Sequence, residues 1–242
     1  MLHLPQNKLL LKKGDPYFAS VVFLSGWEGT NGGTTFTDEE TTPKTLTGNG
    51  GVTTSTAQFK FGASSLFCDL SGGADYITTP ASTDFDFSGQ YTIETFARFA
   101  SGGGISSSLF NRYSATSTDA RWALFISGGI LRWRHFDTAG TQNDISYSFN
   151  PTANQWYHIA VDKDASNVVR LYVDGVMQAS NTFSLGTRTT GTAPNLSIGS
   201  IQGFLNSFDL GGYLDESRIT KDVARYASDT GFVPPNAPFP RF

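Results

Sequence analysis

The chain has 242 residues, a length at which a β-sandwich or barrel commonly forms one domain, and 38% of them are hydrophobic, enough for a substantial core. A net charge of −4 argues against the capture of nucleic acid by a basic face, and no apolar run approaches the roughly 20 residues of a membrane span. The single cysteine, Cys68, excludes an internal disulfide framework.

Residues 1–16 predict an N-terminal arm, because prolines, Gly14 and a polar start interrupt the one short leucine run. We expect this arm to dock on a neighbouring subunit, and a frayed terminus is the alternative. The polar start differs from a secretory signal peptide, which indicates synthesis in the cytoplasm.

From Tyr17 onward, short apolar or alternating runs predict β-strands. In the first half of the chain these runs are 21–24, 65–70, 75–79 and 91–99. Within the Gly, Thr and Ser-rich stretch at 29–56, Gly48-Asn49-Gly50-Gly51 predicts turns. The clearest alternation has a period of two and places four side chains on one face: Tyr91, Ile93, Ala97 and Phe99.

The second half continues the pattern, with runs at 121–126, 131–136, 156–161, 168–173, 176–179, 196–199 and 212–219. Ser127-Gly128-Gly129 predicts one tight hairpin. Asp174-Gly175 predicts another, because a type I′ turn needs positive φ angles. Thr220 is a candidate cap for one short helix at 221–226, and the proline-rich residues 227–242 predict an extended tail.

Many strands with regular turn signals and almost no helix predict an all-β fold. We expect a two-sheet antiparallel jelly-roll sandwich over residues 17–226. The sequence shows no internal repeat and no linker, so these residues are expected to form one domain.

Three segments carry a resemblance to a known family: Asp75–Phe99, Trp156–Gly175 and Gly212–Ile219. They are similar, in order and spacing, to the conserved stretches of laminin-G-like jelly rolls of the concanavalin-A-like lectin/glucanase superfamily. The resemblance implies that fold and a role as a binding or structural module.

Two further details resemble the copies found in tailed bacteriophages. They are the lead-in Gly14-Asp15-Pro16-Tyr17 and the Pro/Phe tail after Tyr226. This resemblance implies a virion component, in a capsid decoration, a tail or a fibre. Other virion proteins are then the expected partners, reached through the arm and the tail of a homo-oligomer, together with host surface glycans.

Calcium is the one cofactor considered, because some family members hold a structural calcium near acidic residues that follow the first strand. Glu28, Asn31 and Asp215 are the candidate ligands, and they are expected to converge if the first and last strands pair. Glu28 departs from the family pattern, which has Asp there. Hydrogen bonds from Asp215 to turns are the alternative.

Carbohydrate sites combine an aromatic platform with polar groups that bind hydroxyls. The candidate ligand-binding residues are Arg112, Arg121, Arg132, Trp133 and Arg134. Along 131–136, Trp133 and the two neighbouring arginines alternate, so one set is expected to face the core and the other solvent. A solvated strand face without a ligand is the alternative.

We expect no enzymatic activity, because no glutamate begins the Glu-x-Asp-x-x-Glu pattern of the retaining glucanases with this fold. A glycoside hydrolase using Asp84 and Asp86 is the weakest hypothesis, since Asp in such a turn region commonly caps the backbone. The leading hypothesis is a phage virion module that also contacts carbohydrate. A lectin-like protein that binds a glycan receptor is the alternative.

Overall fold

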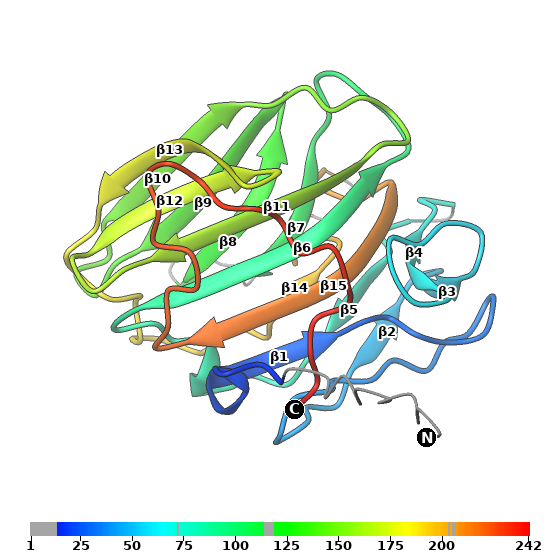
Figure 1. The fold of residues 1–242 in the computed structure, drawn as a ribbon, viewed down its shortest axis with the longest axis horizontal. Helices are drawn as coiled ribbons and strands as arrows, with labels where there is room; N and C mark the ends of the chain where they lie inside the picture. The colour runs from blue at the N-terminus through cyan, green and yellow to red at the C-terminus, as the bar shows by residue number, and fades with distance from the viewer. Residues whose placement is uncertain (1–13, 72, 114–118, 203, 205–206) are drawn as a thin grey trace, which may run out of the picture.

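The computed structural model describes residues 14–71, 73–113, 119–202, 204 and 207–242. Two antiparallel sheets stack face to face, as Figure 1 shows, and confirm the predicted all-β jelly-roll sandwich. Among the described residues the helical segments are the 3₁₀ turns η1 (Phe18–Ser20) and η2 (Thr83–Phe85). None of the helices in this part of the chain is long and apolar enough to cross a membrane.

Sheet A has the order β13-β12-β11-β6-β15-β4-β3, and β1 pairs with the free part of β15. Its strands are β1 (Val21–Ser25), β3 (Thr53–Ser55), β4 (Ser65–Cys68), β6 (Tyr91–Phe99), β11 (Trp156–Lys163), β12 (Val168–Val173), β13 (Val176–Thr182) and β15 (Gly212–Lys221).

Sheet B has the order β10-β9-β8-β7-β14-β5-β2. Its strands are β2 (Thr47–Asn49), β5 (Tyr76–Thr78), β7 (Ser107–Arg112), β8 (Trp122–Ser127), β9 (Ile130–Phe136), β10 (Gln142–Ser148) and β14 (Ser197–Ile198).

Both predicted hairpins form. Asp174 and Gly175 have φ angles of 49° and 76° between β12 and β13, and Gly128 and Gly129 have 56° and 75° between β8 and β9. Positive φ at two successive residues gives a hairpin turn the twist of its strands.

The main core lies between the sheets. The four side chains that alternation assigns to it are confirmed there, since each is at most 2% exposed: Tyr91, Ile93, Ala97 and Phe99. Thr92 and Glu94 face the other side of β6, yet their exposure is also 0%. Another layer therefore covers the outer face of sheet A.

That layer is the C-terminal segment, residues 222–242. In Figure 1 it runs as a red strand-free trace across β11, β6 and β15 and ends beside β1. Phe232 stacks on Tyr226 with ring centroids 3.5 Å apart, and Phe239 is 2% exposed. The main-chain N of Asp15 donates to the carbonyl of Phe242 at 2.7 Å, so the two ends of the described chain meet.

The predicted arm lies mostly outside the described residues, because the description begins at Gly14. The described part of it belongs to the domain, since Asp15 is only 8% exposed.

Two local predictions are wrong, the second of them in part. No helix forms at 221–226, because β15 continues through Lys221, which pairs with Tyr91 of β6, and irregular chain follows. The Thr220 hydroxyl accepts a hydrogen bond from Nε of Arg225 at 2.6 Å instead of capping a backbone turn. Of the predicted turn at 48–51, Gly50 and Gly51 form a turn, whereas Gly48 and Asn49 belong to the short strand β2.

Candidate functional site

The five predicted ligand-binding residues do not share one surface. Trp133 is fully buried between the sheets, with ring-centroid distances of 5.4 Å to Trp122 and 5.5 Å to Tyr91. The structure corrects the prediction for Trp133, because its side chain belongs to the core.

Arg132 and Arg134 lie on the outer side of β9, as alternation predicts. The Arg134 guanidinium donates to both carboxylate oxygens of Asp144, at 3.0 Å from Nε and 2.8 Å from Nη2. Arg132 donates through Nη1 to the carbonyl of Ser127 at 3.2 Å. The two-pronged pair with Asp144 uses the Arg134 donors that a ligand carboxylate would need.

Arg112 and Arg121 are both buried, with 0% and 1% exposure, and the main-chain N of Arg121 donates to the Arg112 carbonyl at 2.9 Å. Arg112 forms an ion pair with Asp86 and donates from Nε to the Pro194 carbonyl at 3.2 Å. Burial lowers the pKa of Arg112; Asp86 opposes this effect, and the positive charge of Arg121 adds to it. Two buried cations thus lie near one another, and Arg112 is the one that is paired with Asp86.

Arg121 lines a cleft of about 610 Å³ at the edge of the sandwich, a volume within the range of small-molecule sites. We call it the Arg121 cleft. Five hydroxyl side chains line it: Thr83, Ser88, Thr138, Thr187 and Thr189. Phe87 adds an apolar wall. Hydroxyls beside an aromatic wall can bind the polar edge and the C–H face of a sugar.

Main-chain contacts hold the cleft together. The Phe87 N donates to Oγ1 of Thr187 and the Thr187 N donates to the Phe87 carbonyl, each at 2.8 Å. The Thr138 N donates to the Gly186 carbonyl at 3.0 Å. The segment around Gly186 is thereby fixed between the loops that follow η2 and β9.

The charges of the Arg121 cleft are mainly positive. Lys221 donates from Nζ to the Thr83 carbonyl at 2.8 Å, which places its ammonium group at the rim. Arg121 donates from Nη1 to the Arg188 carbonyl, but its buried Nε has no hydrogen-bond partner in the protein. A buried donor without a partner carries a free-energy penalty that an acceptor on a ligand can remove.

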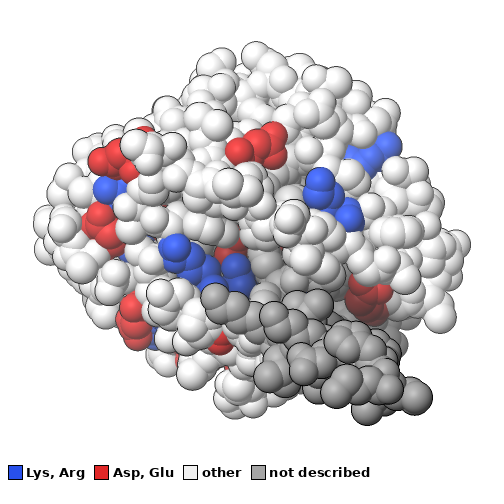
Figure 2. Space-filling model, viewed as in Figure 1, with Lys and Arg blue, Asp and Glu red and all other residues white. Residues whose placement is uncertain are grey.

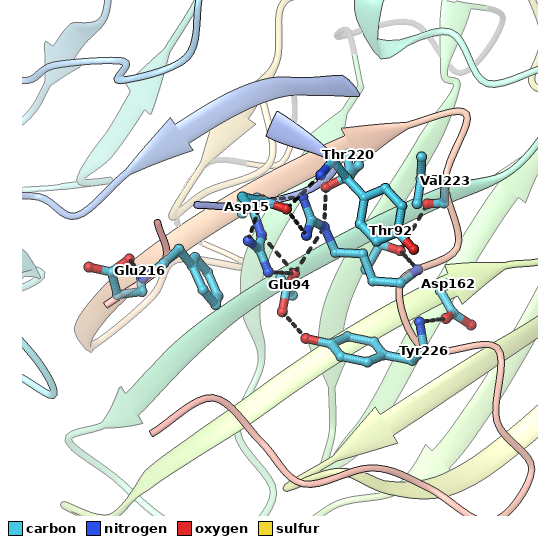
Figure 3. A network of polar contacts seen from close by, with 12 residues as sticks. Asp15, Thr92, Glu94, Asp162, Glu216, Thr220, Val223 and Tyr226 are labelled. Atoms are coloured by element: carbon cyan, nitrogen blue, oxygen red, sulfur yellow. Dashed lines mark hydrogen bonds and ion pairs between the residues drawn. The ribbon is translucent and has the colours of Figure 1, made fainter. Parts of the chain in front are cut away.

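A second charged group lies on the outer face of sheet A beneath the C-terminal segment, and Figure 3 shows its members turned toward one another. Nη2 of Arg218 donates to Oε1 of Glu94 at 2.7 Å, where β15 pairs with β6. Asp15 pairs with Arg218 at 3.1 Å and with Arg225 at 2.7 Å. We call these four residues the strap network.

Glu94 is the centre of the strap network and has two further contacts. Nε2 of His158 lies 3.1 Å from its Oε2, and the Tyr226 hydroxyl donates to the same oxygen. Burial alone would raise the pKa of Glu94, but Arg218 and then His158 outweigh burial and hold it well below its usual range. Through Tyr226 and Arg225 these contacts attach the C-terminal segment to the sheet.

The candidate calcium ligands lie in a fold in which β1 and β15 pair, as predicted. Their oxygens accept main-chain hydrogen bonds: Glu28 from Ala63 at 3.1 Å, Asn31 from Thr56 at 3.2 Å, and Asp215 from Lys60 at 2.6 Å. Within the described ranges, no group of three or more His, Cys, Asp or Glu could hold a metal ion. Calcium needs six to eight oxygen ligands, and the oxygens of these three residues already hold main-chain donors of the segment 56–63.

The carboxylates considered for catalysis are each paired with a cation. Asp84 lies 3.0 Å from Nζ of Lys44, and Asp86 pairs with Arg112. Burial acts to raise the pKa of Asp84, but hydrogen bonds from Lys44 and Ser82 outweigh it and lower that pKa. A general acid needs the opposite shift.

On the face seen in Figure 2, acidic and basic side chains are interspersed among other residues. No continuous basic stripe, of the kind that follows a nucleic-acid backbone, is visible on this face.

Sequence reasoning identified Arg112 and Arg121 but missed the rest of the Arg121 cleft. Its hydroxyls lie on segments that resemble ordinary loops, and Lys221 lies in the region predicted to be a helix. No local pattern links these positions. The fold of the sandwich brings the loops after η2 and β9 together with the segment around Gly186. Only this arrangement places the lining residues of the cleft side by side.

The family model "Laminin_G_3: Concanavalin A-like lectin/glucanases superfamily" matches residues 71–226, more than half of the chain. No curated protein sequence is significantly similar to the chain.

Among solved structures, the chain is similar to the binding domain of Paraclostridial Mosquitocidal Protein 1, with a TM-score of 0.64 and 18% identity over 86% of this chain and 50% of that one. It is also similar to the binding domain of botulinum neurotoxin serotype D, with a TM-score of 0.61 and 10% identity over 87% of this chain and 50% of that one. At these identities the likeness shows the fold alone. The chain spans about half the length of these structures.

Proposed function

The chain belongs to the concanavalin A-like lectin/glucanase superfamily, and on that premise we propose that it is a non-enzymatic module that binds carbohydrate in the Arg121 cleft. The observation that carries the proposal is a cleft that is lined by two cations, Arg121 and Lys221, and by five hydroxyl side chains. The two structural neighbours named above are described as binding domains, which agrees with this use of the fold.

The absence of enzymatic activity is part of the proposal. Glycoside hydrolysis needs one carboxylic acid that donates a proton and a second carboxylate near the same bond. Contacts with cations hold the pKa of Asp84 and that of Glu94 below their usual values, which is the wrong direction for a proton donor, and Asp86 is bound in an ion pair with Arg112. Glu94 is also fully buried under the C-terminal segment, where a polysaccharide does not reach it.

A glycan array tests the binding, with a variant that blocks the cleft. Thr189 is exposed and lines the cleft, so Thr189→Trp is expected to abolish binding without disturbing the core. Thr182→Trp, at an exposed position on β13, is the matched control and should bind as the wild type does. Binding that survives Thr189→Trp in a folded protein, or an array without any hit, would refute the proposal.

We further propose that the module is displayed on a bacteriophage virion, as a capsid decoration, tail or fibre component. The resemblance of the segments around Gly14 and after Tyr226 to phage copies supports this setting. The contact between Asp15 and Phe242 supports it too, because segments attached at either end would leave the domain at one place. Antibodies against the domain should label purified particles of the phage that encodes it, and unlabelled particles would contradict the setting.

Whether the protein is attached to the virion through its ends can be tested only with a deletion that leaves the domain folded. Residues 227–242 lie on sheet A and Asp15 belongs to the strap network, so removing either would unfold the region. Deleting residues 1–13 alone is therefore the test of the arm. We expect the shortened protein to fold with an unchanged melting temperature and to be lost from particles. Normal incorporation would show that the arm is not the attachment.

A further inference from the structure

We infer that the Arg121 cleft selects a sugar that carries a carboxylate, with Arg121 as the anchor of that group. This inference rests on the proposed function, because it names the ligand class of the same cleft. It follows from the charges that line the cleft and from the hydrogen-bond donors that those charges leave unused.

The charged side chains that line the Arg121 cleft carry a net positive charge. Asp86, Arg121 and Lys221 line the cleft, and Asp86 is paired with Arg112 behind it. A ligand therefore meets two cations, Arg121 and Lys221, and one carboxylate that is already neutralised. A neutral sugar would leave these charges without a counterion in a partly desolvated site. An anionic group would be attracted by both.

The Arg121 side chain is buried and is fixed by a hydrogen bond within the protein. Arg121 is 1% exposed as a whole and one of its guanidinium donors binds the Arg188 carbonyl, so the group is held in place before any ligand arrives. Its Nε–H has no acceptor in the protein. A carboxylate oxygen is a strong acceptor for such a donor, because hydrogen bonds between ionised partners are about twice as strong as neutral ones.

The volume and the lining of the cleft favour a sugar acid over a small inorganic anion. A cleft of about 610 Å³ is far larger than one phosphate needs. Hydroxyl side chains such as Thr138, Thr187 and Thr189 lie around it, and Phe87 offers an apolar wall. Hydroxyls can exchange hydrogen bonds with the hydroxyls of a sugar ring. The whole set matches a uronic acid unit of a polysaccharide.

The test compares acidic oligosaccharides with their carboxyl-reduced forms, which keep every linkage and ring. The probes are tetragalacturonate and a hyaluronan tetrasaccharide, each beside its reduced form, on an array that also carries neutral bacterial polysaccharides. We expect a uronate probe to bind and its affinity to fall by about tenfold or more on reduction.

Two variants localise the effect. Lys221→Gln removes a rim charge without touching the core, so it should weaken uronate binding by about threefold. Lys60→Gln, an exposed lysine outside the lining of the cleft, makes the same charge change and should have no effect.

The outcomes separate this inference from the proposed function. Neutral hits alone, or equal binding of a uronate and its reduced form, would overturn the carboxylate inference and leave carbohydrate binding in place. An array without any hit would overturn both. Uronate binding that Lys221→Gln and Lys60→Gln weaken equally would also overturn the inference, because it would show attraction by net charge and no role for the cleft.

Discussion

The ring centroid of Phe239 lies 3.8 Å from the guanidinium carbon of Arg218, so the C-terminal segment rests directly on the strap network. Phe239 is 2% exposed and its main-chain N donates to Oε2 of Glu216 at 2.9 Å. Arg241 adds an ion pair to Glu216 at 2.9 Å. An aromatic ring over a desolvated cation contributes through both packing and cation–π attraction. The segment is therefore an integral layer of the domain.

Replacing Phe239 with Ala should destabilise the domain by about 3 kcal/mol, because it removes a buried ring and admits water to the strap network. Val233→Ala is the matched control on the same segment. Val233 is 88% exposed, so its truncation should change the free energy of unfolding by less than about 0.5 kcal/mol. Urea unfolding measures both. Equal stabilities of the two variants would show that the segment does not hold the sheet.

Glu94→Gln should lower the free energy of unfolding by about 3 kcal/mol, because it leaves the buried Arg218 without its carboxylate. Asp144→Asn is the control. Its pair with Arg134 is about a quarter exposed on both sides, so its loss should cost less than about 1 kcal/mol. A variant at Glu94 as mild as that at Asp144 would mean that the strap network contributes little.

The carboxylate of Glu94 should make the free energy of unfolding depend on pH. The pKa of Glu94 is lower in the folded state than the ordinary 4.5, so its stabilising effect is present above pH 4.5 and is lost as the pH falls toward the folded value. Unfolding free energies measured from pH 6 to 3 should therefore fall more steeply for the wild type than for Glu94→Gln. Parallel curves would contradict this assignment.

Alternation and turn residues were sufficient to predict which side chains face the core and where the hairpins turn, because both depend on neighbours along the chain. Alternation along β6 placed Tyr91 and Phe99 in the core, and the turn chemistry of Asp174 and Gly175 identified the hairpin. The same alternation also separated Trp133 from Arg132. Local pattern thus determines the face on which a side chain lies.

Contacts between distant segments could not be predicted in this way. Arg112 looks like a surface residue in sequence, and its burial depends on two partners far along the chain, the carbonyl of Pro194 and the carboxylate of Asp86. Glu94 has the spacing of a solvent-facing residue, and it is buried because Tyr226 and Phe239 cover that face. The coverage of sheet A depends on where a proline-rich segment lies, and neither hydrophobic period nor turn chemistry specifies that.

Cys68 should be unreactive in the native protein. Its thiol is fully buried on β4, and burial, followed by the negative charge of Asp75, raises its pKa well above the usual value. Because the thiolate is the reactive form, Ellman's reagent should modify no thiol in buffer and one thiol per chain in guanidinium chloride. Equal rates of modification in the two conditions would show that Cys68 is accessible.

Asp215 should make the domain less stable as the pH rises through neutrality. The side chain is fully buried on β15, its Oδ2 accepts from the main-chain N of Lys60 and of Phe61, and its Oδ1 has no partner. Burial raises its pKa to about 7; the two main-chain donors oppose this effect, and the nearby Glu216 adds to it.

A carboxyl group with a raised pKa in the folded state stabilises the protein fully below its unfolded pKa, and this contribution is lost as the pH rises to the folded value. For Asp215 that interval runs from the ordinary 3.8 to about 7. The unfolding free energy of the wild type should therefore decline between pH 5 and 8 by about 2 kcal/mol more than that of Asp215→Asn, which cannot ionise. Asp229→Asn, whose side chain is 69% exposed, should keep the wild-type slope. If Asp215→Asn keeps it as well, Asp215 is ionised throughout, and the two main-chain donors outweigh the cost of its burial.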